Sequence, residues 1–144
     1  MFVGLYIHAI DAKNRIFIPS QFRRSKPSKN PYIISRGLEK CLYLFESERW
    51  GDIIGKFENL SWSDKTAQRA FKRMLLAGAV ETYSDSHGRL LLPSHLMEYA
   101  GIKDEVAVVG MGDRLEIWDS GRWKVYSSGF GEKSFRALAE KLDI

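Results

Sequence analysis

Hydrophobic segments of strand length recur along the chain, and each of them ends at a turn residue. The segments GLYIHAI and AVETYS contain β-branched and aromatic residues and lead into polar turns, and the apolar runs RIFIP and RLLLP stop at proline. A serine follows each proline, an arrangement that favours the start of a short helix. The extended segments PYIIS and CLYLF, and later EVAVVG and LEIWD, form pairs separated by glycine-containing turns. Each half of the chain is therefore predicted to have the order ββαββ.

Two further segments have the spacing of amphipathic helices. Their apolar residues recur three and four positions apart. These residues are Ala67, Ala70, Phe71, Met74 and Leu75 in the first segment, and Phe135, Leu138, Ala139 and Leu142 in the second. The polar segments SWSDK and FGEKS precede them, and Gly78 follows the first. The sequence thus predicts a helical extension after each four-stranded half.

The chain contains an internal duplication. At an offset of 74 residues DAKNRIFIPSQF matches DSHGRLLLPSHL, with identical residues at Asp11/Asp85, Arg15/Arg89, Pro19/Pro93 and Ser20/Ser94. At an offset of 73 residues LYLFESERW matches LEIWDSGRW, which places Trp50 and Trp123 at equivalent positions. Matches at two nearly equal offsets indicate two copies of one structural unit.

Four-stranded halves of this size bury little apolar surface on their own. We therefore expect the two repeats, residues 1–78 and 79–144, to interleave their strands about a pseudo-two-fold axis and to form one compact α+β domain with a barrel at its centre. Trp50 and Trp123 are expected to be largely buried, in the core or against a helix. The same symmetry would bring the two Asp-x-x-x-Arg turns close together.

Composition and charge narrow the classes of function. The 144 residues are 44% hydrophobic and 28% charged, which is typical of a globular domain. The single cysteine, Cys41, excludes an intramolecular disulfide and a multi-cysteine zinc site. The longest apolar runs are too short to span a membrane and no signal peptide is evident, so we expect a soluble, cytoplasmic protein without a membrane partner.

The basic residues are concentrated in the first part of the chain. Residues 1–40 hold eight Lys or Arg against two acidic residues, whereas the remainder holds fourteen basic and sixteen acidic residues. This asymmetry favours a polyanionic partner near the N-terminal segment. A solvated basic loop around SKPSKN would account for part of the same charge.

The two Asp-x-x-x-Arg turns carry the most informative chemistry. An aspartate that opens a tight turn accepts hydrogen bonds from backbone amides further along, and Asn14 and Gly88 tolerate the positive φ such a turn needs. One interpretation is that Asp11/Arg15 and its equivalent Asp85/Arg89 are only ion pairs that brace a turn. The other is that each carboxylate orients a guanidinium whose free edge meets a phosphate or a guanine. Lys13 accompanies Arg15, and His87 stands at the equivalent place in the second repeat.

Catalytic and cofactor sites are not expected. Two aspartates at a two-fold axis could form an aspartic protease dyad, but an arginine four residues after each one would keep both ionised. Cys41 opens an apolar strand with no histidine nearby, which favours a core position over a nucleophile. His8, His87 and His95 lack the spacing of metal ligands, apart from a weak set of Asp85, His87 and His95 that the first repeat does not reproduce. No glycine-rich phosphate loop is present. We therefore expect no enzyme, no cofactor, no metal site and no small-molecule substrate.

Several segments together resemble the MraZ family. They are GLYIHAIDAKNRIFIPSQFR, CLYLF with Trp50, GRLLLPSHLMEYAGI, VAVVG, and LEIW with Trp123, and the resemblance covers essentially the whole chain. It implies an AbrB-like swapped-hairpin, double-split β-barrel built from two intrachain repeats with flanking helices. The first motif of the family commonly has Gly before its Arg, where this chain has Asn14.

The resemblance also implies a function. It implies a nucleoid-associated transcriptional regulator that binds double-stranded promoter DNA of the bacterial division and cell-wall operon at repeated boxes, represses its own operon, and assembles into a ring-shaped homo-oligomer, an octamer in the family. The expected DNA-binding residues are Arg15, Arg89, Lys13, Asn14, His87, Arg23 and Arg24, with Asp11 and Asp85 as orienting partners. The alternative is a ring-forming structural or interaction module whose basic loops bind an acidic protein or RNA.

Overall fold

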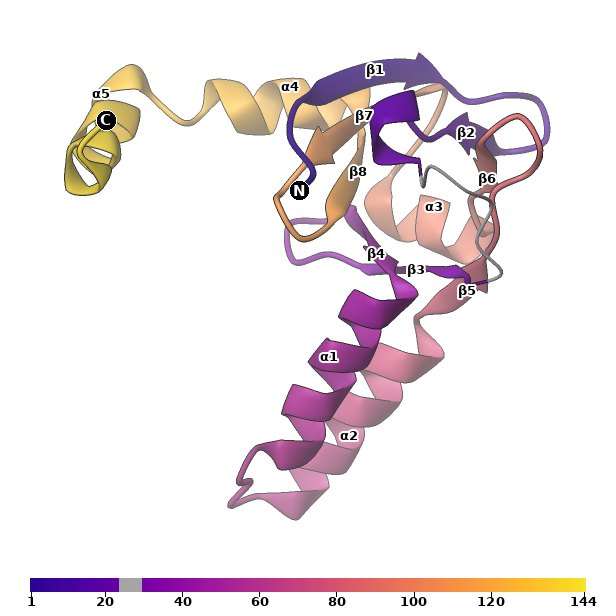
Figure 1. Ribbon diagram of the computed structural model, residues 1–144, viewed down its shortest axis with the longest axis vertical. Helices are drawn as coiled ribbons and strands as arrows, with labels where there is room; N and C mark the ends of the chain where they lie inside the picture. The colour runs from indigo at the N-terminus through magenta and orange to yellow at the C-terminus, as the bar shows by residue number, and fades with distance from the viewer. Residues whose placement is uncertain (24–29) are drawn as a thin grey trace.

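The computed structural model describes residues 1–23 and 30–144 (Figure 1). The strands within these ranges are β1 (Leu5–Ala9), β2 (Arg15–Phe17), β3 (Tyr32–Arg36), β4 (Leu42–Glu46), β5 (Val80–Thr82), β6 (Arg89–Leu91), β7 (Glu105–Gly110) and β8 (Leu115–Asp119). The helices are α1 (Ser47–Asn59), α2 (Lys65–Ala77), α3 (Ser94–Ala100), α4 (Ser120–Ser128) and α5 (Glu132–Ala139), with 3-10 turns η1 (Ser20–Phe22) and η2 (Glu140–Leu142). The mixture of helices with antiparallel strands confirms the predicted α+β class.

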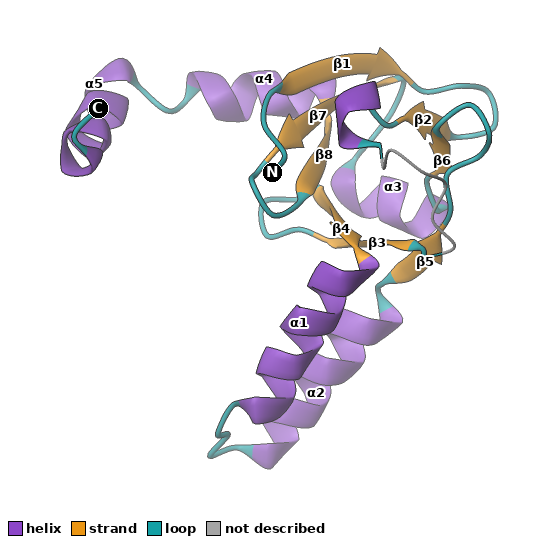
Figure 2. Ribbon diagram, in the orientation of Figure 1, coloured by secondary structure: helices purple, strands orange, loops and turns teal. Residues whose placement is uncertain are grey.

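Strands from the first half of the chain pair with strands from the second half. A six-stranded antiparallel sheet has the order β1-β7-β8-β4-β3-β5, and β2 pairs with β6 in a separate ladder. The pairs β1–β7 and β5–β3 are equivalent under the duplication, and β2–β6 and β4–β8 each join a strand to its own copy. Figure 2 shows the large sheet curving around the core. Strands β2 and β6 lie on the side between β1 and β5, which are the two edge strands of the large sheet. The pairing therefore has pseudo-two-fold symmetry.

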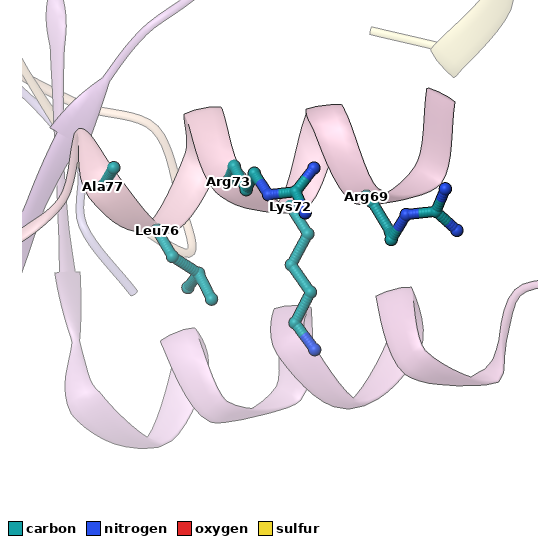
Figure 3. A pocket seen from close by; sticks show the side chains of 5 residues that line it. All are labelled: Arg69, Lys72, Arg73, Leu76 and Ala77. Carbon is teal, nitrogen blue, oxygen red and sulfur yellow. The ribbon is translucent and has the colours of Figure 1, made fainter. Parts of the chain in front are cut away.

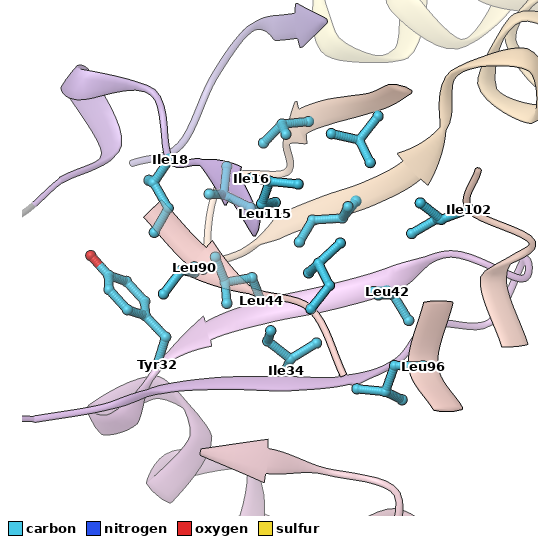
Figure 4. Close-up of a cluster of buried hydrophobic side chains, with 14 of the residues drawn as sticks. Ile16, Ile18, Tyr32, Ile34, Leu42, Leu44, Leu90, Leu96, Ile102 and Leu115 are labelled. Atoms are coloured by element: carbon cyan, nitrogen blue, oxygen red, sulfur yellow. The ribbon is translucent and has the colours of Figure 1, made fainter. Parts of the chain in front are cut away.

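The core lies inside this curved sheet and draws on both halves of the chain. Its buried aliphatic residues include Ile16, Ile18, Ile34, Leu42 and Leu44 from the first half, and Leu90, Leu92, Leu96, Val106, Val108, Leu115 and Ile117 from the second (Figure 4). Ile16 and Leu90 face each other across the β2–β6 ladder and are 1% and 0% exposed. The ladder that carries both Asp-x-x-x-Arg turns is therefore anchored directly in the core.

Helices α1 and α2 form a hairpin that projects away from the barrel (Figure 1). The helix predicted around residues 67–75 is confirmed as α2. Asp64 caps α2 by accepting a hydrogen bond from the Ala67 amide at 2.9 Å, and α2 ends before Gly78. Helix α1, which follows β4 without a loop, is not predicted by the apolar spacing of the sequence. Stacked rings of Phe57 and Phe71, 5.6 Å apart, join the two helices.

The expectation that Trp50 and Trp123 are largely buried is confirmed in part, because both side chains are partly buried but lie outside the fully buried core. Each lies in the first turns of a helix that leaves the barrel, α1 for Trp50 and α4 for Trp123. One side of each ring packs on the preceding strand, at 5.6 Å from the Phe45 ring and 5.4 Å from the Trp118 ring. The equivalence of the two positions holds, but the helices direct the other side of each ring to solvent.

Cys41 is fully buried, beside Ala107, Val109 and Trp118. Burial, with a smaller contribution from the nearby charge of Glu116, raises the pKa of the Cys41 thiol to about 12. Because the thiolate is the reactive species, Cys41 is expected to resist iodoacetamide at pH 8 in the folded protein and to react fully in urea. Mass spectrometry of both samples measures this, and rapid modification of the folded protein would contradict a core position.

Candidate nucleic-acid interface

The first Asp-x-x-x-Arg turn is closed by the carboxylate of Asp11. Its Oδ1 accepts hydrogen bonds from the backbone amides of Lys13 and Arg15, both at 2.9 Å. Its Oδ2 accepts a hydrogen bond from Nε of Arg15 at 2.7 Å. Asn14 has a φ of +59°, in the left-handed region that asparagine tolerates better than most residues. One side chain therefore shapes the backbone of the turn and orients the arginine.

The second turn repeats this arrangement. Oδ1 of Asp85 accepts from the amides of His87 and Arg89 at 2.9 Å, and Oδ2 accepts from Nε of Arg89 at 2.7 Å. Gly88 takes the place of Asn14, with a φ of +75°. The hydrogen bonding expected from the turn chemistry is confirmed in both repeats.

Pairing of β2 with β6 brings the two turns together. Residue Arg15 lies opposite Leu91, and Phe17 lies opposite Arg89. Nη1 of Arg15 lies 3.9 Å from Oδ2 of Asp85, and Nη1 of Arg89 lies 4.0 Å from Oδ2 of Asp11. Two arginines and two aspartates thus form a four-charge cluster, hereafter the arginine–aspartate cluster. Sequence reasoning anticipated the proximity of the turns but missed these ion pairs between them.

The arginines of this cluster are held in place yet accessible. Their side chains are 27% and 25% exposed for Arg15 and Arg89. Within residues 1–23 and 30–144, their hydrogen bonds and ion pairs use Nε and Nη1. Nη2 of each guanidinium is therefore the group that can donate to an external acceptor such as a phosphate oxygen or a guanine edge.

The cluster keeps both carboxylates ionised. The backbone hydrogen bond from Arg89 is the largest cause that lowers the pKa of Asp85, to about 2, and the side-chain hydrogen bond from Arg89 adds to it. The pKa of Asp11 is lowered by the equivalent bonds from Arg15. Each carboxylate therefore stabilises the folded state above the pKa it has when unfolded, and this contribution is lost as the pH falls towards the folded pKa.

An NMR titration of the Asp85 side-chain carboxyl carbon is expected to show a midpoint near pH 2 in the folded protein. In the urea-unfolded chain, where the turn is absent, the midpoint should lie at about 3.9. Equal midpoints in the two states would contradict the hydrogen bonds assigned to this carboxylate.

The remaining predicted site residues lie around the cluster. The side chains of Lys13, Asn14 and His87 are exposed on the tips of the two turns. The side chain of Arg23 lies against the second turn, where its Nε would be 2.5 Å from a Cβ atom added at Gly88. Arg23 also donates a hydrogen bond from Nε to the carbonyl oxygen of Ile18 at 2.8 Å. Arg24 lies outside the described residues.

The absence of a side chain at Gly88 is what allows Arg23 to approach. The first repeat has Asn14, which carries a side chain, at the equivalent position. The cationic side chains beside the two turns therefore differ. Arg23 was named from its charge alone, and its contact with the opposite repeat has no signal in the sequence.

Within residues 1–23 and 30–144, no group of three or more His, Cys, Asp or Glu side chains is placed to hold a metal ion. None of the helices described is both long and apolar enough to cross a membrane.

Comparison with known proteins places the chain in a family. The model of the family described as "MraZ protein, putative antitoxin-like" matches twice, over residues 1–74 and 75–143. The "Transcriptional regulator MraZ" of Acetivibrio thermocellus is 41% identical over 142 residues, covering 99% of this chain and 96% of that protein. The proteins of the same name from Carboxydothermus hydrogenoformans and Clostridium tetani are 42% and 38% identical, with the same coverage. On these grounds the chain belongs to the MraZ family.

Proposed function

We propose that this protein is a transcriptional regulator that binds double-stranded DNA through the arginine–aspartate cluster. The observation that carries the proposal is the paired geometry of Arg15 and Arg89. Both arginines lie on the β2–β6 ladder, and each guanidinium is oriented by the carboxylate of an aspartate. The name of the relatives, transcriptional regulator, supports the same function. Arg15 and Arg89 contact base edges or phosphates, and Lys13, Asn14, His87, Arg23 and Arg24 supply neighbouring contacts.

A single copy of the cluster offers few contacts with DNA. One bidentate arginine–guanine pair discriminates by about 1 to 3 kcal/mol, which is far short of the specificity of a regulator. Several linked copies reach it by multivalency, because each further binding event is intramolecular. The proposal therefore includes a ring-shaped homo-oligomer, octameric as the family resemblance implies, that reads repeated boxes in a promoter.

The finer parts of the proposal come from the resemblance. The target is the promoter of the division and cell-wall operon, the action is repression of the protein's own operon, and the place is the nucleoid in the cytoplasm. The fold is an AbrB-like swapped-hairpin barrel of two repeats, 1–78 and 79–144. Pairing of β1 with β7 and of β5 with β3 supports this fold, since each half contributes strands to the other.

The test is binding to the DNA upstream of the protein's own gene, measured by gel shift and fluorescence anisotropy at several salt concentrations. Because lysine and arginine contacts release counterions, affinity should fall steeply with salt, with a log–log slope of about −0.9 for each phosphate contacted. A scrambled duplex of equal length should bind more weakly. Equal affinity for both duplexes, or binding only to RNA or to an acidic protein, would reject the proposal.

A further inference from the structure

We propose that Phe17 and Leu91 are specificity-determining residues that contact the 5-methyl groups of thymine in the major groove of DNA. The inference rests on the proposed function, because it assigns a further sequence-reading role to the ladder that carries Arg15 and Arg89. It deepens that function by naming a base, and the chemical group of that base, which the apolar side chains of the ladder recognise.

The β2–β6 ladder has an inner and an outer face. Ile16 and Leu90 lie on the inner face, where both are buried in the core. Because successive side chains of a strand point to opposite faces, the residues on either side of these two lie on the outer face. They are Arg15 and Phe17 on β2, and Arg89 and Leu91 on β6. Two arginines and two apolar side chains therefore share one small surface.

The strand register places each apolar residue beside both arginines. Phe17 lies opposite Arg89 across the ladder. Leu91 lies opposite Arg15. Opposite residues of an antiparallel pair have Cα atoms about 4.5 to 5.5 Å apart, and residues two positions apart on one strand are about 6.8 Å apart. A duplex that the two guanidinium groups contact therefore also meets the two apolar side chains.

Both apolar side chains are accessible. Phe17 and Leu91 are 43% and 55% exposed. The centroid of the Phe17 ring lies 6.4 Å from that of the His8 ring, which supports one side of Phe17. A single exposed apolar residue is ordinary on a protein surface. Here the exposure recurs at equivalent positions of the two repeats, 74 residues apart, and in each case beside the arginines of the cluster.

The chemistry of the major groove selects the ligand of these side chains. The groove is about 12 Å wide and admits a two-stranded β-ribbon. The base edges in it present hydrogen-bonding groups, and the apolar group among them is the C5-methyl of thymine. Contact of this methyl group with Phe17 or Leu91 removes apolar surface from water on both sides. An apolar side chain that enters the groove beside an arginine is therefore matched by thymine.

Replacement of thymine by uracil tests the inference directly. The duplex upstream of the protein's own gene is prepared with deoxyuridine in place of thymidine, which removes every 5-methyl group and keeps the hydrogen bonds of the base pairs. Burial of one such carbon changes affinity about fourfold, and the contact recurs in every engaged copy. We expect the wild-type protein to bind the thymine duplex about fourfold or more tightly than the uracil duplex. Equal affinity for the two duplexes would overturn the inference.

Variants show which residues sense the methyl groups. A Phe17→Ala/Leu91→Ala protein is expected to bind the two duplexes with nearly equal affinity, because it lacks the apolar contacts. Its salt dependence should match that of the wild-type protein, since no phosphate contact is removed. Each protein is measured at a salt concentration at which it binds. A thymine preference that persists in this variant would come from the shape of the DNA or from other residues, and it would overturn the inference.

Leu76 on α2 supplies the matched control. Its side chain is 41% exposed, close to the value for Phe17. It also lies beside cationic residues, in an open hollow lined by Arg69, Lys72 and Arg73 (Figure 3). The hollow belongs to the α1–α2 hairpin and not to the β2–β6 ladder (Figure 1). Leu76→Ala should therefore keep the full thymine preference, and its loss there would contradict a role specific to the ladder.

Sedimentation and thermal unfolding separate the remaining outcomes. Because both positions are exposed, the Phe17→Ala/Leu91→Ala protein should keep the oligomer and the melting temperature of the wild type. Weaker assembly with an unchanged thymine preference would assign the two residues to a contact between copies and overturn the inference. Equal wild-type binding to the promoter and to a scrambled duplex would instead reject the proposed function.

Discussion

Replacement of Arg15 by alanine is expected to abolish promoter binding while the oligomer and the melting temperature stay nearly unchanged. The Arg15 guanidinium is oriented by Asp11 and lies 27% exposed at the surface, so its loss removes a contact with DNA and leaves the core intact. One charge-assisted contact to a base is worth about 1 to 3 kcal/mol, and the substitution removes it from every copy engaged with the promoter. Binding by several linked copies therefore multiplies the loss.

Arg89→Ala is expected to act in the same direction. The hydrogen bonds of the two turns are equivalent. Lys13 is the exposed basic neighbour of the first turn, and the guanidinium of Arg23 lies against the second turn at Gly88. Each turn therefore has a cationic neighbour, and both arginines should contribute to the attraction for DNA.

The measurement is titration of promoter DNA with each variant at matched salt, with sedimentation and thermal unfolding in parallel. Arg49→Ala is the matched control, because Arg49 has a similar exposure, 32%, and is ion-paired with Asp113 at 2.8 Å, away from the cluster. Wild-type affinity for Arg15→Ala in an intact oligomer would exclude the cluster as the DNA-reading element. Attention would then move to Arg23 and to the basic segment that follows it.

Leu90→Ala is expected to lower the free energy of unfolding by about 2 to 5 kcal/mol. Leu90 is 0% exposed and pairs with Ile16 in the ladder that carries both turns. Its truncation leaves a cavity between β2, β6 and the sheet, which the surrounding strands can fill only in part. Because the ladder holds the arginine–aspartate cluster, DNA affinity should decline as the temperature approaches the lowered melting point.

The neighbouring Leu91 is the control for this prediction. Leu91 is 55% exposed on the same strand, so Leu91→Ala should change the free energy of unfolding by about 0.5 kcal/mol or less. Urea unfolding of the three proteins, followed by tryptophan fluorescence, gives the comparison. Equal midpoints for Leu90→Ala and the wild-type protein would mean that the β2–β6 ladder adds little to the core.

Local features of the fold could be predicted because their causes are local. The alternation of apolar residues, the prolines after RIFIP and RLLLP, and the glycine-containing turns indicate the strands that the structure contains. Asp11 with Asn14, and Asp85 with Gly88, indicate turns whose hydrogen bonds join residues at most four apart. Helix α1 was missed because it continues directly from β4, with neither a proline nor a glycine to mark its start.

The amino-acid sequence alone indicates the strands, the turns, helix α2 and the duplication, since each depends on residues close together or on a comparison within the chain. Other features follow from the folded arrangement of the two repeats: Arg15 lies close to Asp85, Arg23 lies over Gly88, and the two tryptophans are partly buried. These contacts join residues about 60 or more positions apart or depend on the direction in which a helix leaves the barrel. Such contacts arise from the packing of one repeat against the other, and no short pattern of residues encodes that packing.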